Sequence, residues 1–410
     1  AQQAQLLQLR GDLAERQSNF AQAVAAYQAS LALAEPHSPL CVEILNGLST
    51  VFWRQVARQA AEDYAQQALT LARAWQETHG IATSLLNLGI LANEQGRCAE
   101  AERYLQEGLA LFGDTDDSLD KGRLLNALGV VMNERGNLAE AHAYFAASLA
   151  IHRVHGNLLG IERALSNLGV VATDFATAKA YFAEGLALNR KMGDRLGAAF
   201  SLLNLGLTEL DLGDLQNAKA TLAEGKKEFQ TLQAVQGVAG CDESLGDIAI
   251  MEGNIHQALA HYEQVVQTFR LLGTNNRLVS ALATLAILWV QQGELGRAHT
   301  ALVEALQISL DFGVKPLLLS ALGAAAWFAY TQGHLQASAT WYGLATTREY
   351  QGAVYQKHQQ ALAEKLRARL SVPVFEQFTA SGKTLEPDTA AAQALAELCK
   401  QGSAHPSSNL

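Results

Sequence analysis

The chain has few prolines and few cysteines for its length. Only 6 of its 410 residues are proline, and because an interior proline costs a helix ~3 kcal/mol, this scarcity favours long helices. The 4 cysteines, Cys41, Cys98, Cys241 and Cys399, lie far apart and form no Cys-x-x-Cys pair. We therefore expect reduced, mostly buried thiols in a cytoplasmic protein.

The chain also lacks long apolar runs and clusters of positive charge. Its longest apolar stretches, 278–290 and 317–330, are shorter than the ~20 residues that a membrane span needs. No signal peptide precedes the first helical pattern, and the chain begins inside that pattern, as a piece of a longer protein would. The net charge is −10 and Lys and Arg form no run, although clustered Lys and Arg are what bind a phosphate backbone. We expect neither a membrane nor direct nucleic acid as a partner.

Small residues recur along the chain with a period of 40. One series is Gly96, Gly136, Gly213, Gly253, Gly293 and Gly333, with gaps of 40, 77, 40, 40 and 40. A second series is Gly89, Gly129, Gly169, Gly206, Gly246, Ala286 and Ala326, with gaps of 40, 40, 37, 40, 40 and 40. A third series is Ala101, Ala141, Ala178, Ala218, Ala258 and Ala298, with Ser338 following. All three share one slip, which predicts a three-residue deletion near 172–175 and shorter helices in that unit.

Each unit has the pattern of a helix, a turn and a second helix. Leu85 and Leu88 share one face of a first helix at helical spacing. Gly96 follows that helix, and we expect it to end the helix in a left-handed conformation, which glycine adopts without a Cβ penalty. Gly89 and Ala101 are small where the two helices should cross closely, because a larger side chain would overpack the contact by ~1–3 kcal/mol.

These signatures resemble the tetratricopeptide repeat. The match consists of Asn-Leu-Gly on the first helix, a turn glycine seven residues later, an alanine five beyond that, and then an aromatic and a small residue. Asn-Leu-Gly stands at 87–89, 167–169 and 204–206. The resemblance implies an all-α, tetratricopeptide-type helix-turn-helix solenoid, a right-handed superhelix of about nine helix pairs over 1–348. It leaves the function open, because this repeat serves many roles.

After residue 345 the period stops and a different pattern follows. The tail carries Trp341, Arg348, Glu349, Gly352, Leu366, Phe375, Phe378, Gly382, Leu385, Ala391, Ala394 and Leu395. This pattern is similar to the end of the repeat region in bacterial signal-transduction ATPases with numerous domains, many of which regulate transcription. The resemblance implies an isolated sensor piece that follows an N-terminal ATPase domain. The residues themselves predict a helical cap at 349–400, which covers the last repeat, and a polar tail at 401–410.

The segment Ser381-Gly382-Lys383-Thr384 imitates the end of a phosphate loop. The full motif needs a glycine five residues before Gly382, where Gln377 stands, and a strand before the loop. We interpret the segment as a glycine turn that leads to Thr384 as the N-cap of a helix. We therefore expect no binding or hydrolysis of ATP.

Three other motifs suggest metal sites but lack the necessary partners. The Asp-Phe-Gly triplet at 311–313 imitates a kinase triplet, yet it falls at an expected inter-repeat turn with no catalytic loop. His152 and His155 lie one helical turn apart without a matching Cys or carboxylate, so we predict a solvated helix end. The acidic segment 114–120 has Leu125 where an EF-hand needs glutamate, so we predict an inter-repeat turn. We expect no metal, no cofactor and no enzymatic activity.

The resemblance implies that the first helix of each repeat lines a concave groove. Its polar candidates are Asn46, Trp53, Arg54, Asn87, Asn93, Glu94, Arg123, Asn126, Asn133, Glu134, Arg163, Asn167 and Asn204. Arg123 and Arg163 are 40 residues apart, hence stacked in adjacent repeats, and together could hold a carboxylate or phosphate. Its apolar candidates are Leu203, Leu207, Leu210, Ile250, Ile287, Val290, Trp327 and Tyr330. The alternative interpretation is that the asparagines are ordinary for this repeat and that the apolar stripe is core or lies under the cap.

Two functions remain open on this basis. One is a sensor module of a signalling ATPase, which binds a peptide, protein or small-molecule effector in the groove. The other is a free-standing scaffold or co-chaperone that holds protein partners. The reading frame upstream of the chain would distinguish them.

Overall fold

The protein is an all-helical repeat structure, as the period predicts. The computed structural model describes residues 2–17, 19–113, 116–347 and 352–403. All regular secondary structure within these residues is α-helix. The chain divides into two compact units, unit 1 (Ala1–Gly193) and unit 2 (Asp194–Leu410).

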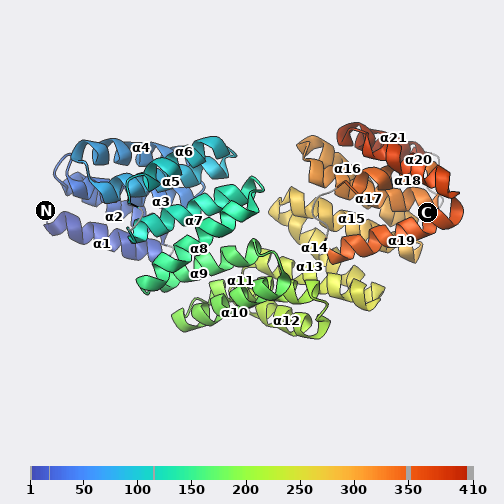
Figure 1. The fold of residues 1–410 in the computed structure, drawn as a ribbon, viewed down its shortest axis with the longest axis horizontal. Coiled ribbons are helices and arrows are strands. Elements are labelled where there is room, and N and C mark those ends of the chain that lie inside the picture. Colours follow the sequence, from blue (N-terminus) through green and yellow to red (C-terminus); the bar gives the residue numbers. More distant parts are fainter. Residues whose placement is uncertain (1, 18, 114–115, 348–351, 404–410) are drawn as a thin grey trace, which may run out of the picture. The chain divides into compact units, whose positions relative to one another are not determined.

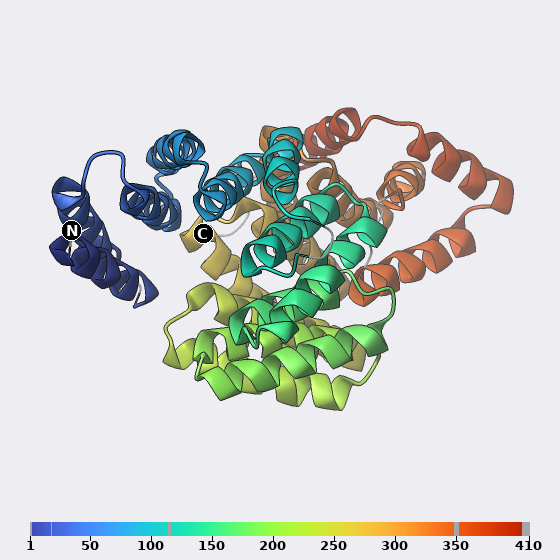
Figure 2. The same ribbon diagram turned by 60° about the vertical axis from the view of Figure 1, so that its left-hand side comes forward.

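Unit 1 is built from helix pairs that stack in sequence order (Figures 1 and 2). Its helices are α1 (Gln2–Arg16), α2 (Phe20–Leu33), α3 (Pro39–Arg54), α4 (Arg58–Trp75), α5 (Thr78–Glu94), α6 (Cys98–Leu109), α7 (Leu119–Glu134), α8 (Leu138–Val154), α9 (Leu158–Val170) and α10 (Phe175–Met192). The first helices α3, α5, α7 and α9 contact one another from pair to pair and form an inner layer. The second helix of each pair packs on its own first helix and on the next one.

Unit 2 continues the pairing and ends in additional helices. Its helices are α11 (Arg195–Asp211), α12 (Leu215–Thr231), α13 (Val235–Glu252), α14 (Ile255–Leu272), α15 (Asn275–Gln292), α16 (Leu295–Phe312), α17 (Lys315–Thr331), α18 (Leu335–Ala345), α19 (Ala353–Arg369), α20 (Val372–Lys383) and α21 (Pro387–Ser403). One apolar cluster runs from α13 through α17 into α19, α20 and α21. The predicted cap is therefore continuous with the repeat core.

The recurring glycines have two separate roles. Gly96 and Gly253 follow first helices with φ of 73° and 79°, so the predicted left-handed helix ends are confirmed. Gly89, in contrast, makes room for a side chain: a Cβ there would lie 2.6 Å from Leu105 of the paired helix. Gly129 accommodates Phe145 in the same way. At the expected close crossing, therefore, a large side chain of the second helix packs over a glycine of the first helix.

The three-residue slip falls on one helix only. Helix α9 has 13 residues, whereas α7 has 16 and α10 has 18. Asp174 then caps α10 by accepting a hydrogen bond from the amide of Thr177 at 2.8 Å. Our expectation that both helices of this unit are shorter is therefore wrong for the second one, because a new side-chain cap starts it at full length.

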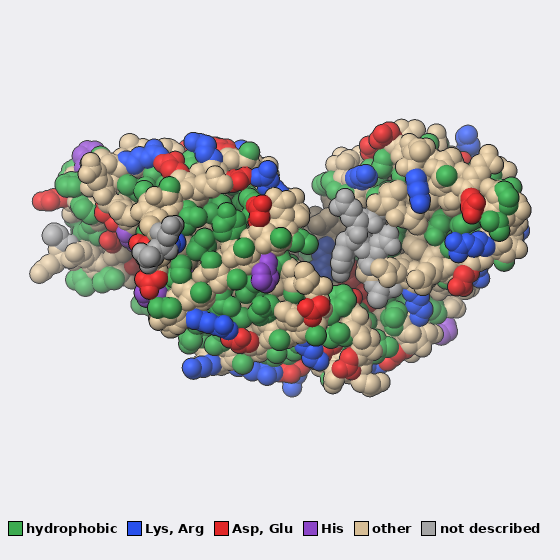
Figure 3. Space-filling model, viewed as in Figure 1, with side chains coloured by type: hydrophobic (Ala, Val, Ile, Leu, Met, Phe, Trp, Pro, Cys, Tyr) green, Lys and Arg blue, Asp and Glu red, His purple; other side chains and the backbone are tan. Residues whose placement is uncertain are grey.

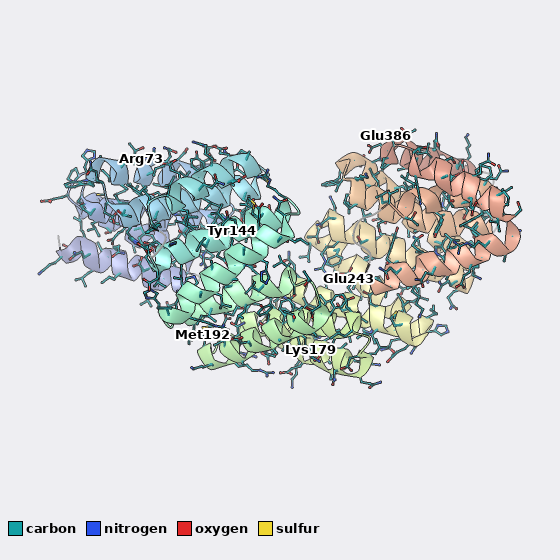
Figure 4. All side chains as sticks on the ribbon, in the orientation of Figure 1. Arg73, Tyr144, Lys179, Met192, Glu243 and Glu386 are labelled. Atoms are coloured by element: carbon teal, nitrogen blue, oxygen red, sulfur yellow. The ribbon has the colours of Figure 1, made fainter. Side chains whose placement is uncertain are left out.

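Exposed ion pairs join consecutive repeats within each unit. In unit 1, Arg97 binds Glu62 at 3.0 Å, and Arg73 of α4, labelled in Figure 4, pairs with Glu107 of α6. In unit 2, Arg270 binds Glu304. Blue and red side chains lie near one another at several places on the face shown in Figure 3. Each such surface pair contributes at most ~1 kcal/mol to the free energy of unfolding. The pairs therefore show which repeats are neighbours but account for little of the stability.

The cap is held by a close crossing of α18 and α20. A Cβ on Gly343 would lie 2.3 Å from the Thr379 carbonyl oxygen, and one on Gly382 would lie 2.0 Å from the Thr340 carbonyl oxygen. Gly382 therefore allows two helix backbones to touch and does not form a turn. Thr384 caps the C-terminus of α20, so our assignment of Thr384 as an N-cap is wrong.

Several sequence predictions concern chain ends and turns. The Asp-Phe-Gly triplet lies at the expected turn, where α16 ends and Gly313 has φ 61°. Of the four cysteines, Cys41 and Cys241 are buried, Cys98 is half-buried and Cys399 is exposed, so the expected burial holds for two of them. The tail positions Arg348 and Glu349, two residues of the acidic segment at 114–115, and the polar stretch 404–410 lie outside the described residues.

Candidate functional site

The inner helices of unit 1 line a groove with a volume of about 1420 Å³. It runs along α3, α5, α7 and α9, and the C-terminal ends of α1 and α8 reach it. Its polar and aromatic lining includes Glu15, Ser49, Thr50, Trp53, Arg54, His79, Asn87, Asn93, Glu94, Asp120, Arg123, Asn126, Glu134, His152, His155, Asn157 and Arg163. From the predicted ligand-binding set, the structure brings together Trp53, Asn87, Asn93, Arg123, Asn126 and Arg163.

Two asparagines of the groove, Asn87 and Asn126, are bound by asparagines of the neighbouring repeats. The Asn167 amide donates to Asn126 Oδ1 at 3.0 Å, and the Asn87 amide donates to Asn46 Oδ1 at 3.4 Å. These pairs join neighbouring inner helices, so part of the capacity that we assigned to a ligand is used within the protein. Asn93 differs, because its buried Oδ1 has no hydrogen-bond partner among the described residues.

Three arginines, on the inner helices α3, α7 and α9, give the groove its positive charge. Arg54 lies 3.6 Å from Glu15, and Arg123 lies 3.5 Å from Asp120. Arg163 makes no ion pair or hydrogen bond within the described part of the chain. Desolvation by the groove walls, together with the positive charges of Arg54 and Arg123, lowers the pKa of Arg163. An anion placed here would relieve this repulsion.

His152 extends the same wall as a neutral hydrogen-bond donor. It is 3% exposed and packs between Gly122 and Gly160, where no Cβ occupies the space of its ring. Burial, and then the charges of Arg123 and Arg163, lower its pKa and keep it uncharged. The sequence interpretation as a solvated helix end is therefore wrong for His152, because two glycines on neighbouring helices open a pocket for it.

The tautomer of His152 follows from its neighbour Asn157. The Asn157 side-chain carbonyl accepts from the Gly160 amide at 3.3 Å, which orients the amide nitrogen toward His152 Nδ1 at 3.2 Å. Because that nitrogen can only donate, Nδ1 accepts and Nε2 carries the proton. His152 thus offers an N–H group beside two guanidinium groups.

A carboxylate on the opposite side of Arg123 balances part of the charge. Asp120 accepts from His79 Nδ1 at 2.5 Å, and this hydrogen bond is the main cause that raises the pKa of His79. Asp120 therefore interacts with both His79 and Arg123, whereas the one carboxylate whose charge acts on Arg163, that of Glu162, forms no ion pair with it. Arg163 is the more available of the two predicted arginines.

The remaining predicted residues lie outside this groove. Asn133 is half-buried near the end of α7, and Asn167 lies beside Asn126. Asn204 belongs to α11 of unit 2, where its carbonyl accepts from Thr208. Sequence reasoning missed His79, Asp120 and the burial of His152. The only signal for His152 was a glycine near the start of each neighbouring inner helix, at Gly122 and Gly160.

Trp327 and Tyr330 do not face an open groove. Trp327 is 3% exposed and donates its indole N–H to the His358 carbonyl of α19 at 3.2 Å. Arg369 of α19 lies over the Tyr330 ring at 5.5 Å. Our prediction of these two residues as free ligand contacts is corrected, because helix α19 of the same chain covers them. Ile250 and Val290 of the predicted apolar stripe are likewise buried.

The described ranges contain neither a membrane-spanning helix nor a metal-binding cluster. None of the helices there is both long and apolar enough to cross a bilayer. No cluster of three or more His, Cys, Asp or Glu side chains in those ranges has the arrangement of a metal site.

The stacked helix pairs and the polar groove define a repeat protein of the binding type. Residues 9–77 and 80–153 match the tetratricopeptide repeat family, so the chain contains tetratricopeptide repeats, which are interaction modules. Among curated proteins, none matches the chain by sequence.

Solved structures share the fold at low sequence identity. A Rap protein complexed with competence and sporulation factor has a TM-score of 0.59 and 14% identity, over 89% of this chain and 99% of that one. A signal transduction ATPase with numerous domains from Pyrococcus horikoshii, which has a tetratricopeptide repeat sensor, has a TM-score of 0.56 and 15% identity, over 86% of this chain and 55% of that one. The apo form of RapI has a TM-score of 0.50 and 16% identity, over 66% and 99%. At these identities the similarity concerns the fold alone.

Proposed function

We propose that this chain is the sensor part of a larger cytoplasmic signalling protein and binds an effector with an anionic group in the groove of unit 1. The observation that carries the proposal is Arg163, a cation on the groove wall that makes no ion pair or hydrogen bond among the described residues, although the charge of Glu162 acts on it. Arg123 and the N–H group of His152 stand beside it. The two planar guanidinium groups and the single N–H group of His152 together suit a carboxylate or a phosphate.

The larger protein that we propose is a bacterial signal-transduction ATPase of the numerous-domain type, in which this chain follows the ATPase domain and its output regulates transcription. The similarity to the Pyrococcus horikoshii sensor supports this, since the shared part is 86% of this chain but only 55% of that protein. A peptide effector is supported by the Rap protein, whose structure contains competence and sporulation factor. A protein or small-molecule effector would use the same donors.

A free-standing scaffold or co-chaperone is the alternative. The match to the Rap protein covers 99% of that chain, so a protein of this fold can consist of the repeats alone. The reading frame upstream of the chain separates the two functions: an encoded nucleotide-binding domain supports the sensor, and its absence supports the scaffold.

The effector site can be tested by a thermal-shift screen followed by calorimetry. Short acidic peptides are offered as free acids and as C-terminal amides, with inorganic phosphate in a third arm. A bound probe should raise the melting temperature by mass action, and the preferred arm distinguishes carboxylate from phosphate.

Variants then locate the binding site. Since a hydrogen bond to a charged group contributes ~1.5–3 kcal/mol, Arg163→Ala should weaken binding by roughly 10- to 150-fold. The matched control is Arg153→Ala on α8, an exposed arginine of the same unit that pairs with Glu184 at 2.7 Å; it should leave binding unchanged. Equal affinities of wild type and Arg163→Ala would refute the site.

A further inference from the structure

Helix α19 lies across the inner helices of unit 2 as a ligand helix would. It contacts α13 and α17 of the inner layer and α18 beside them. Three contacts anchor it: the bond from Trp327 to the His358 carbonyl, the Arg369 side chain over Tyr330, and the Lys357 ammonium group at 2.8 Å from the Ile250 carbonyl. Lys357 thereby meets the negative end of α13, where a cation is stabilised by the helix dipole.

The buried face of α19 has the spacing of an amphipathic helix. Its fully or nearly buried side chains are Val354, His358, Gln359, Leu362, Ala363 and Leu366. Leu362 and Leu366 are completely buried and belong to the same apolar cluster as α13, α15 and α17. The opposite face, with Gln360 and Ala368, is exposed. This is the arrangement of a helix in a groove, with anchors three to four residues apart.

Two polar residues stand in the middle of this apolar face. Both His358 and Gln359 are 4% exposed. His358 Nε2 and both amide atoms of Gln359 have no hydrogen-bond partner among the described residues. Gln359 can lie there only because α17 has Gly323 beneath it, where a Cβ would come within 2.8 Å of its amide nitrogen. Buried polar atoms without partners weaken the docking of the helix that carries them.

We propose that α19 is an exchangeable occupant of a helix-binding groove formed by α13 and α17. The groove's partner is an amphipathic helix with aliphatic residues where α19 has His358 and Gln359. Such a helix has the same aliphatic anchors as α19 and a basic residue in place of Lys357, which meets the C-terminal end of α13. It buries no polar atom without a hydrogen-bond partner. It therefore displaces α19. This groove belongs to unit 2, so the proposal is independent of the effector site in unit 1.

The opposite interpretation is that α19 is a permanent part of the core. Amide hydrogen exchange on the wild-type chain separates the two. An exchangeable helix should open locally, so α19 amides should exchange at least tenfold faster than those of α17. Equal protection of α19 and α17 would overturn the proposal.

Binding is tested with a fluorescent synthetic peptide of residues 353–369 that carries H358L and Q359L. The full-length chain is prepared as wild type, as an undocked variant (Leu362→Asp with Leu366→Asp), as a tightened variant (His358→Leu with Gln359→Leu), and as a control with two aspartates on the exposed face (Gln360→Asp with Ala368→Asp). We expect the undocked variant to bind the peptide at least tenfold more tightly than wild type. The tightened variant should bind at least tenfold more weakly, and the control should match wild type.

Three outcomes would overturn the proposal. If the undocked variant loses the folded structure of unit 2, α19 is an integral part of the core. If all four chains bind the peptide alike, or none binds it, the groove does not receive a helix. If the undocked variant forms dimers in which α19 is exchanged, the occupant is a second copy of this chain and not a partner helix.

Discussion

The crossing of α18 and α20 offers a sharp test of how the cap is attached, through Gly343→Ala. The added Cβ would lie 2.3, 2.7 and 2.8 Å from the carbonyl oxygen, Cα and carbonyl carbon of Thr379. All three are backbone atoms, so no side-chain rotation relieves the clash and α20 has to move. The perturbation therefore acts on the whole contact between the last repeat and the cap.

The expected magnitude combines two opposing effects. Overpacking costs ~1–3 kcal/mol, and a rigid backbone neighbour places this site at the upper end. Alanine gains ~1 kcal/mol over glycine within a helix, so the net destabilisation should be ~2 kcal/mol. Gly296→Ala on α16 is the matched control, because nothing lies within 4 Å of its added Cβ. It should stabilise the protein by ~0.4–1 kcal/mol.

Urea denaturation, followed by circular dichroism and tryptophan fluorescence, measures both variants. Trp327 and Trp341 are buried in unit 2 and report on the affected region. The two variants should differ by ~3 kcal/mol, with their midpoints on opposite sides of the wild-type value. If Gly343→Ala is as stable as Gly296→Ala, the helices do not cross at this distance and the attachment of the cap described above is incorrect.

Three further predictions address the buried histidine, the repeat register and nucleotide binding. Burial lowers the pKa of His358 from 6.5 to about 4. As the pH falls below 6.5, the unfolded chain therefore takes up this proton before the folded chain does. The free energy of unfolding should decline by ~3 kcal/mol between pH 6.5 and pH 4. His358→Leu should flatten this part of the stability profile, and an unchanged slope would contradict the assignment. Ala258→Leu, at a fully buried position of α14, should cost ~1–3 kcal/mol in urea denaturation, whereas unchanged stability would mean that the register is wrong. Calorimetry with ATP and magnesium should show no binding, since Lys383 ends a helix whose Gly382 packs on α18; micromolar binding abolished by Lys383→Ala would contradict this.

The repeat architecture could be predicted from the sequence because it depends on contacts that recur with the period. The end of a first helix requires a residue in the left-handed conformation, which glycine adopts at no steric cost. Gly96 and Gly253 both adopt this conformation. The inner helices follow from the Asn-Leu-Gly signature, so the candidates Arg123 and Arg163 meet in one groove. Both kinds of inference use interactions within a unit or between adjacent units, which a 40-residue repeat encodes directly.

The tertiary structure decided what the period does not encode. His152 is buried because two glycines on neighbouring helices leave space for its ring, and two groove asparagines are bound by asparagines of the neighbouring repeats. The bond from Lys357 to the Ile250 carbonyl joins residues 107 positions apart, a separation unrelated to the repeat. The apolar stripe of unit 2 therefore reads as a binding surface from the sequence alone. Trp327 and Tyr330 of this stripe are covered because α19 folds back over them. Such a non-periodic contact depends on three-dimensional complementarity between distant segments.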